Sequence, residues 1–409
     1  MPMDRRTFVA SATSFAAAAV VAPARALADA PVHRSAVDDP LGVRADFPIL
    51  DNGRTFLNSA YITPSPLAVT AAGAAFLQSK STRPLSVGEL LSKTGEVCTQ
   101  FAKLIHAAPE EVGFVFATSE GENTVANNVP LMPGDNVVVD DLHYDGALVA
   151  YRQLEKRRGI QLRIVKHRNG AVTTADFAKL VDARTRLIAV SYVSSVNGLR
   201  HNVRALADLA HAHGALLHID AIQAVGMFPI DVHADDVDFL CAGTYKWLLG
   251  GFGVAPFYIR QSLLDRVPMD RFGIFQVATT LPDNHFELKK TARRYNYASL
   301  PFAEVHQLSA ALTYLERVGV DRIAEHTLGL TRRLEAGLLE QGYTLFTPLG
   351  NRSSVLCFYT RRPAAEINSA LSAAKVDVSV RDDHIRASIA LFNNTDDIDR
   401  LLAVTRRLA

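Results

Sequence analysis

The chain has 409 residues, of which 48% are hydrophobic and 21% are charged, and its formal net charge is +1. This length suits two domains, or one large and one small domain, and the balanced charge gives no basis for binding nucleic acid or an anionic membrane surface. The cysteines Cys98, Cys241 and Cys357 are too few and too far apart for a disulfide framework or a cysteine-rich metal site.

Residues 1–30 differ from the rest of the chain. They carry an arginine pair, Arg5 and Arg6, then an alanine-rich apolar segment, then small residues typical of cleavage after Ala28 or Ala30. Pro23 ends the apolar segment before it reaches the ~20 residues that span a bilayer. The pattern resembles a twin-arginine export signal. It predicts a protein that is exported or periplasmic, with no membrane span in its mature form.

After an N-terminal arm at residues 31–64, short apolar runs alternate with helical patterns. The runs that indicate buried strands are Val112–Ala117, Asn136–Asp140, Leu162–Val165, Leu187–Tyr192, Ala215–Ile219, Val237–Cys241 and Val254–Ile259. Amphipathic helices lie between several of them, for example Ala147–Arg158 and Val203–His213. This alternation predicts an α/β fold, a mostly parallel seven-stranded sheet covered by helices on both faces. We place this large domain at residues 65–290.

The last part of the chain has a different pattern. Two long helices are expected, then two strands, then a closing helix: Glu304–Val318, Asp321–Gln341, Ser354–Tyr359, Ile385–Ile389 and Thr395–Leu408. This order predicts a smaller α+β domain at residues 291–409.

Polar side chains follow several of the expected strands. They carry hydroxyl, imidazole, carboxylate and amide groups: Thr118, Ser119, His143, Ser195, Asp220 and Gln223. Ligands of open α/β sheets bind beyond the carboxyl ends of the strands, so we expect these residues at one site. Thr118 and Ser119 open a helix, where hydroxyls and free N–H groups suit a phosphate, although such residues are also common helix caps.

Asp220 and Lys246 together indicate a cofactor. A carboxylate beside a buried strand is costly unless it is paired, and a helix cap through Gln223 is one explanation for Asp220. The pyridinium nitrogen of pyridoxal phosphate explains it better, because Lys246 lies in the apolar segment GTYKWLLGGFG. Desolvation there lowers the pKa of the lysine and leaves its amine nucleophilic, as a Schiff-base lysine requires.

Two segments make a family resemblance specific: HIDAIQAVGMFPIDV (His218–Val232) and TYKWLLGGFG (Thr244–Gly253). With FLNSAYITP (Phe56–Pro64) and IRASIALFNNTDDIDRLL (Ile385–Leu402), they make the chain resemble class V aminotransferases. These are fold-type I pyridoxal phosphate enzymes, and they include cysteine desulfurases and isopenicillin N epimerase-like proteins. The resemblance covers nearly all of the chain after the export signal. We expect the N-terminal arm to combine with the C-terminal third in the smaller domain.

The resemblance implies the residues of the site. It places the cofactor against Thr118, Ser119, His143, Ser195, Asp220, Gln223, Thr244, Lys246 and Ser299, and the substrate against Asn58 and Arg386. Lys246 is then the catalytic residue that holds the cofactor as an aldimine, and Asp220 pairs with the pyridinium. His143 stacks on the ring, Gln223 contacts its phenolic oxygen, and Arg386 binds the substrate carboxylate.

The same resemblance implies a homodimer, because Ser299 falls where relatives reach the phosphate of the neighbouring subunit. Some positions depart from the family pattern. Ser195 stands where relatives often have asparagine. Many relatives read Ser-x-His-Lys where this chain reads Gly243 to Lys246, so a phosphate hydroxyl is missing unless Thr244 supplies it. Whether Tyr245 takes over the role of the histidine stays open.

The expected function is a pyridoxal phosphate-dependent enzyme that acts at the α-carbon of an amino acid. Epimerase (isomerase), aminotransferase (transferase) and lyase reactions all remain open. Desulfuration through a protein persulfide is not expected, since residues 376–386 contain no cysteine. A non-catalytic periplasmic binding protein that keeps the fold is the alternative. His211, His213 and His218 raise the possibility of a metal, but cationic residues are favoured near a helix end, and we expect no metal site.

Overall fold

The computed structural model describes residues 38–409, which form one unit. The predicted export signal at residues 1–30 lies outside the described residues. None of the described helices combines the length and the apolar character that crossing a bilayer requires. The expected boundary between a large and a small domain near residue 290 stays a prediction.

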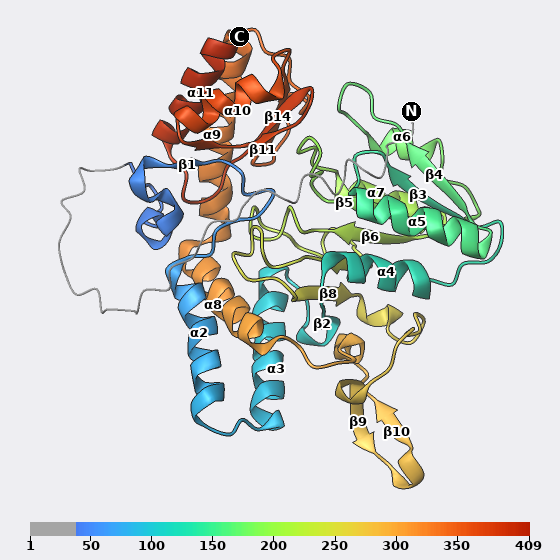
Figure 1. The fold of residues 1–409 in the computed structure, drawn as a ribbon. Helices are drawn as coiled ribbons and strands as arrows, with labels where there is room; N and C mark the ends of the chain where they lie inside the picture. The colour runs from blue at the N-terminus through green and yellow to red at the C-terminus, as the bar shows by residue number, and fades with distance from the viewer. Residues whose placement is uncertain (1–37) are drawn as a thin grey trace. The chain divides into compact units, whose positions relative to one another are not determined.

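A seven-stranded sheet forms the centre of the structure, in the order β2-β8-β7-β6-β5-β3-β4 (Figure 1). Its strands are β2 (Val112–Val115), β3 (Asn136–Asp140), β4 (Gln161–Val165), β5 (Thr185–Ser191), β6 (Leu216–Asp220), β7 (Phe239–Cys241) and β8 (Ala255–Ile259). Only β8 runs antiparallel to its neighbours, β2 and β7. The mostly parallel seven-stranded sheet predicted from the apolar runs is confirmed, with strand ends that differ by a few residues.

Helices cover both faces of this sheet. On one face, α4 (Thr118–Asn128) and α5 (Asp145–Arg158) pack over alternate strand residues such as Val137 and Val139. On the other face, α7 (Val203–Ala212) packs over residues such as Val138 and Leu217. Successive strand residues point to opposite faces, so a strand buried on both faces must be apolar throughout. This is why the strands were recognisable as continuous apolar runs.

The C-terminal third contains the expected long helices, α8 (Phe302–Val318) and α9 (Val320–Glu340). They are followed by a three-stranded sheet of β11 (Val355–Tyr359), β14 (His384–Ser388) and β13 (Ser379–Val380), with α10 (Ala364–Ala373) and α11 (Thr395–Leu408) beside it. The N-terminal arm joins this part, because β1 (Thr55–Phe56) pairs in parallel with β12 (Val376–Asp377). We expected the arm to join this part of the chain, but the pairing of these two strands was not predicted.

Two helices that the periodicity did not predict, α2 (Leu67–Thr82) and α3 (Val87–Leu104), pack against α8 (Figure 1). A capping box starts α3, since Ser86 Oγ accepts a hydrogen bond from Glu89 N and Glu89 Oε2 accepts one from Ser86 N. A hairpin of β9 (Val277–Thr280) and β10 (Phe286–Leu288) precedes α8.

Candidate active site

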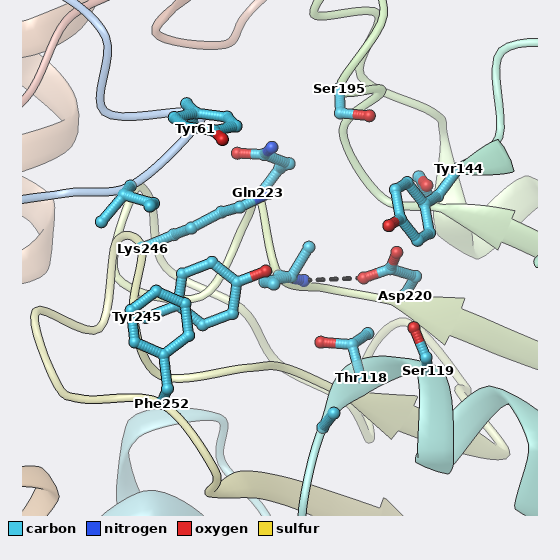
Figure 2. A pocket seen from close by; sticks show the side chains of 14 residues that line it. Tyr61, Thr118, Ser119, Tyr144, Ser195, Asp220, Gln223, Tyr245, Lys246 and Phe252 are labelled. Atoms are coloured by element: carbon cyan, nitrogen blue, oxygen red, sulfur yellow. Dashed lines mark hydrogen bonds between the residues drawn. The ribbon is translucent and has the colours of Figure 1, made fainter. Parts of the chain in front are cut away.

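A cavity of about 290 Å³ lies at the carboxyl ends of β5 and β6 (Figure 2). Polar groups from the sheet and aromatic rings from the loops line it: Tyr61, Ile62, Ala117, Thr118, Ser119, Tyr144, Ser191, Ser195, Asp220, Ile222, Gln223, Tyr245, Lys246 and Phe252. Six of the predicted site residues are among them: Thr118, Ser119, Ser195, Asp220, Gln223 and Lys246. The rule that ligands bind beyond the carboxyl ends of parallel strands therefore located the cavity correctly.

Lys246 lies in the loop between β7 and β8, and a set of local contacts fixes this loop. Thr244 Oγ1 donates to the carbonyl oxygens of Gly251 and Val254, and Leu249 N donates to the carbonyl of Lys246 at 2.8 Å. Burial lowers the pKa of Lys246 to about 8. The charge of the nearby Asp220 opposes this shift, and the charge of Arg386 adds to it. The neutral amine, which a nucleophile or a base requires, is therefore far more populated near neutral pH than in an ordinary lysine.

Asp220 is the last residue of β6 and is 4% exposed. Within the described residues, its side chain accepts one hydrogen bond, from Ile222 N to Oδ1 at 3.0 Å (Figure 2). Burial raises the pKa of this carboxyl, and the charge of His143 partly opposes the rise. Asp220 thus presents a carboxylate to the cavity with room for a cationic partner.

The start of α4 forms another wall of the cavity. Thr118 and Ser119 are its first two residues, so the positive end of the helix dipole and their hydroxyls lie at the cavity. Thr118 Oγ1 also accepts a hydrogen bond from Gly243 N at 2.8 Å, which ties α4 to the loop that carries Lys246. This wall suits an anionic group.

Gln223 is held rigidly at the cavity. Its Nε2 donates to the carbonyl of Ala60 at 2.8 Å, and its Oε1 accepts from Trp247 Nε1 at 2.8 Å. The amide therefore joins the N-terminal arm to the lysine loop, and one Nε2 hydrogen remains for a ligand.

Arg386 on β14 does not line the cavity, although it is close enough for its charge to lower the pKa of Lys246. It is 6% exposed, Nη1 donates to the carbonyl of Ser195, and Nε has no hydrogen-bond partner among residues 38–409. Burial lowers its pKa to about 10. In the part of the chain that the structure describes, no carboxylate pairs with this guanidinium. Asn58, also outside the cavity lining, has a buried Oδ1 without a partner.

The structure does not bring His143, Thr244 and Ser299 to the cavity wall. His143 is 1% exposed and lies behind the wall, where Nδ1 is 2.9 Å from Ser191 Oγ. The hydroxyl of Thr244 is used by the two backbone carbonyls of its own loop. Ser299 is exposed and lies outside the lining.

Aromatic residues at the cavity were not predicted as site residues. Tyr144, Tyr61 and Phe252 are each more than half exposed and line the cavity, and Phe252 stacks on Tyr245 with ring centroids 4.3 Å apart and an interplanar angle of 16°. Tyr144 directly follows His143, so it is the ring that this loop presents to the cavity (Figure 2). A sign of this role is present in the sequence, since Tyr144 is next to His143, but only the histidine was predicted to contact the cofactor.

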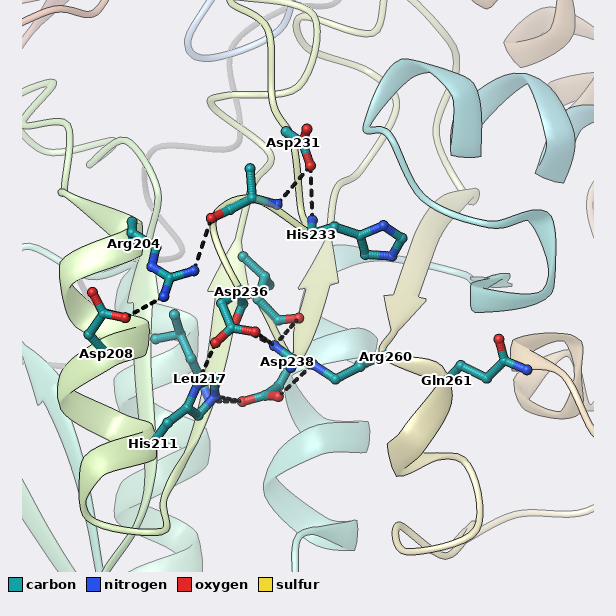
Figure 3. A network of polar contacts seen from close by, with 12 residues as sticks. Arg204, Asp208, His211, Leu217, Asp231, His233, Asp236, Asp238, Arg260 and Gln261 are labelled. Atoms are coloured by element: carbon teal, nitrogen blue, oxygen red, sulfur yellow. Dashed lines mark hydrogen bonds and ion pairs between the residues drawn. The ribbon is translucent and has the colours of Figure 1, made fainter.

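The three histidines considered for a metal do not meet. His218 contacts Glu122, His213 contacts the carbonyl of Leu209, and His211 lies between Asp236 and Asp238 (Figure 3). Among residues 38–409, no group of histidine, cysteine and carboxylate side chains has the arrangement of a metal site.

Comparison with known proteins gives a consistent answer. The sequence model of the family described as Aminotransferase class-V matches residues 55–401. A cysteine desulfurase of Klebsiella pneumoniae is 31% identical over 398 residues, covering 90% of this chain and 97% of that protein. One of Enterobacter sp. is 30% identical over the same length with the same coverage.

Solved structures share the fold. The apo cysteine desulfurase of Thermococcus onnurineus NA1 has a TM-score of 0.83 and 23% identity, covering 92% of this chain and 99% of its own. The cystine C-S lyase C-DES, solved with its product cysteine persulfide, has a TM-score of 0.82 and 18% identity, covering 89% of this chain and 100% of its own. Another structure of C-DES contains glycine covalently linked to pyridoxal phosphate.

Proposed function

This chain belongs to the class-V aminotransferase family and is a pyridoxal phosphate-dependent enzyme, and we propose that it acts at the α-carbon of an amino acid with Lys246 as its catalytic residue. The single observation that carries the proposal is the cavity in which the Lys246 amine, with its pKa lowered to about 8, lies with the buried carboxylate of Asp220.

The residues at the cavity fit this cofactor. The start of α4, with Thr118 and Ser119, would hold the phosphate, and Asp220 would face the ring nitrogen. Gln223 has a free amide hydrogen for the phenolic oxygen. When bound, pyridoxal phosphate supplies an aldehyde that condenses with amines and a ring that withdraws electrons from the α-carbon.

The residues of the chain supply the remaining steps. Lys246 would hold the cofactor through its neutral amine and, once released by a substrate amine, would accept or return the proton of the α-carbon. Asp220, as an anion, would favour a proton on the ring nitrogen. Arg386 offers an unpaired buried guanidinium to a substrate carboxylate, which orients the α-carbon toward Lys246. Epimerisation, transamination and elimination all begin with this proton transfer.

The curated relatives are cysteine desulfurases, but a persulfide on a protein thiol does not suit this chain. Cys98, Cys241 and Cys357 are fully buried, and burial raises the pKa of Cys98 and of Cys357 to about 12. A buried thiol with a raised pKa is a poor nucleophile. The proposal is therefore a reaction without a protein thiol, which leaves epimerase, aminotransferase and lyase activity. No observation favours a non-catalytic binding protein.

The test is a screen of amino acids against the purified holoenzyme. Visible absorption of the cofactor reports binding, and product analysis separates racemised, keto-acid and elimination products. We expect a spectral change with an α-amino acid and none with the same compound lacking the amine. If no amino acid changes the spectrum or is turned over, the proposal is wrong.

Export and dimerisation are further parts of the proposal. We propose that residues 1–30 direct the protein to the periplasm, with Arg5→Lys/Arg6→Lys expected to retain it in the cytoplasm on cell fractionation. We also propose a homodimer in which Ser299 reaches the site of the partner subunit. Ser299→Ala should weaken cofactor binding in a dimer, and an unchanged cofactor affinity would contradict the shared site.

A further inference from the structure

A buried polar cluster lies directly behind the cavity. Its members come from separate elements: Glu122 from α4, Tyr151 from α5, His218 from β6, and His143 from the loop after β3. None of the four is more than 3% exposed. We call these four residues the Glu122 cluster.

Glu122 is the centre of the cluster. Its Oε1 accepts a hydrogen bond from Tyr151 Oη at 2.5 Å, and its Oε2 is 3.1 Å from His218 Nε2 and 3.7 Å from His143 Nε2. A buried carboxylate costs several kcal/mol unless donors or cations surround it. Here they hold the pKa of Glu122 well below its usual value although burial opposes the shift, with His218 contributing most and His143 next. Glu122 is therefore an anion.

The cluster is connected to the cavity through His143. Its Nδ1 is 2.9 Å from Ser191 Oγ, and Ser191 both lines the cavity and pairs with Asp220 in the sheet register. Its Nε2 faces Glu122 and has no hydrogen-bond partner at normal distance. The ring therefore lies between the carboxylate of the cluster and the carboxylate of the cavity.

Charged groups from three elements face His143. Glu122 lies on α4, Asp140 at the end of β3, and Asp220 at the end of β6. Burial is the strongest single influence and opposes ionisation of the ring, but Glu122, Asp140 and Asp220 together outweigh it, so the pKa of His143 is raised.

Other charged groups balance the three carboxylates. Asp140 is itself 3.2 Å from His201, and the charge of Lys246, which also lines the cavity, favours the ionised form of Asp220. Asp220 is the group that depends on His143. Burial raises the pKa of its carboxyl and the charge of Glu122 adds to the rise, while the charge of His143 is the strongest influence that opposes it.

We propose that Glu122 is a positioning residue that keeps His143 as an imidazolium, and that this cation keeps Asp220 ionised at the ring nitrogen of the cofactor. The inference rests on the role given to Asp220 in the proposed function. Without Glu122, its direct repulsion of Asp220 is lost, but so is the charge of His143, which is the larger of the two influences on Asp220. Among the described residues, Lys246 is then the one cation that still favours the ionised carboxylate. The carboxylate of Asp220 then becomes protonated more readily. A neutral Asp220 stabilises the protonated ring nitrogen of the cofactor less well.

The test compares Glu122→Gln with Glu111→Gln. Glu111 is a matched control, since it is 4% exposed, its Oε2 is 2.7 Å from His233 Nε2, and it does not line the cavity. In the apoprotein labelled with ¹³C-histidine, the resonance of His143 is assigned by its loss in His143→Gln. We expect wild type and Glu111→Gln to keep His143 protonated through neutral pH, and Glu122→Gln to lower its titration by about one pH unit or more.

The second readout is the pH titration of the visible absorption of the holoenzyme. Glu122→Gln and His143→Gln should shift this titration in the same direction, while Glu111→Gln leaves it unchanged. An unchanged His143 resonance in Glu122→Gln would overturn the inference. If Glu122→Gln does not fold, the absorption titration of His143→Gln decides: a titration unchanged from wild type would overturn the inference. Since the resonance is measured without cofactor or substrate, failure of the proposed reaction leaves this readout standing.

Discussion

Two histidine–carboxylate groups lie at opposite ends of β6, and they differ in how their charges are matched. At the amino end, His211 is 3.0 Å from Asp236 and 2.8 Å from Asp238, and Arg260 pairs with both carboxylates (Figure 3). Asp238 also accepts a hydrogen bond from Leu217 N at the start of β6. We call this group the Asp238 cluster.

At the carboxyl end, the Glu122 cluster and Asp220 are less complete. His143 Nε2 is 3.7 Å from Glu122 Oε2, and among the described residues Asp220 accepts only one hydrogen bond, from a backbone N–H. Buried polar groups are normally satisfied, so the carboxylate of Asp220, which lines the cavity, marks a place where a ligand supplies the rest. Charge matched within the protein stabilises the fold, whereas charge left open at the carboxyl edge is available for chemistry.

The sharpest test of this contrast is Lys246→Ala. Removing the amine takes away both nucleophile and base, so turnover should fall by about 1,000-fold or more. The free energy of unfolding should change little, because the ammonium has no ion pair in the described residues. Steady-state kinetics and urea unfolding measure the two effects. Retained turnover would remove Lys246 from the mechanism.

Asp220→Asn should be nearly as damaging. The amide cannot keep a proton on the ring nitrogen, so electron withdrawal weakens, and we expect turnover to fall by about 100-fold or more. The amide keeps the shape of the side chain, and its oxygen can still accept from Ile222 N. Kinetics of the variant after full loading with cofactor provide the measurement, and unchanged turnover would show that the reaction makes little use of the ring as an electron sink.

The same substitution at the other end of β6 should give the opposite result. Asp238 is 2% exposed and contacts His211, Arg260 and Leu217. Asp238→Asn breaks a buried ion pair, so the free energy of unfolding should fall by about 2–4 kcal/mol while turnover at a temperature where the variant is folded stays unchanged. A loss of turnover without a loss of stability would show that the Asp238 cluster is not purely structural.

Much of this contrast was readable from the sequence, and part of it was not. Asp220 and Lys246 were recognisable because charged residues in apolar segments are rare and need a reason. The Glu122 cluster was not, because it depends on contacts between residues far apart in the chain. His143 and Thr244 carried the right residue types, but the side-chain direction within each loop decides whether a residue reaches the cavity, and no periodicity fixes that direction.

The fold shows the same division. Mostly apolar runs identified each strand of the central sheet, since burial on both faces favours apolar residues at successive positions. The pairing of β1 with β12 and the helices α2 and α3 were missed. The strand pairing joins residues that are far apart in the sequence. The pattern of apolar residues in α2 is only weakly amphipathic, and its buried positions include Val69 and Gly73.

Arg386→Lys tests the open charge at the substrate side. A lysine keeps the positive charge but loses the bidentate fork that matches a carboxylate. We expect the apparent Kd for amino acids to rise by about 10- to 100-fold, with a much smaller change for matched amines that lack the carboxylate. Spectral titration of the bound cofactor measures both. Equal changes in the two sets of ligands would make Arg386 a structural residue.

The smallest expected effect is the pH dependence of the Asp238 cluster. Hydrogen bonding to Asp238 raises the pKa of His211, burial opposes the rise, and the charges of Asp238 and Asp236 add to it. A group whose pKa is higher in the folded state stabilises the fold fully below its unfolded pKa of about 6.5 and loses this contribution as pH rises through the folded value. The side chain of His211 is 28% exposed, so solvent screens the interaction, and we expect a contribution of less than about 1 kcal/mol to the free energy of unfolding.

The measurement is the difference in unfolding free energy between wild type and His211→Gln across this pH range. The difference should shrink as pH rises, and because His211 lies at the amino end of β6, the absorption titration of the cofactor should not follow it. A difference that grows with pH would mean that the folded state holds His211 neutral, and the match of charges at this end of the strand would then rest on Arg260 alone.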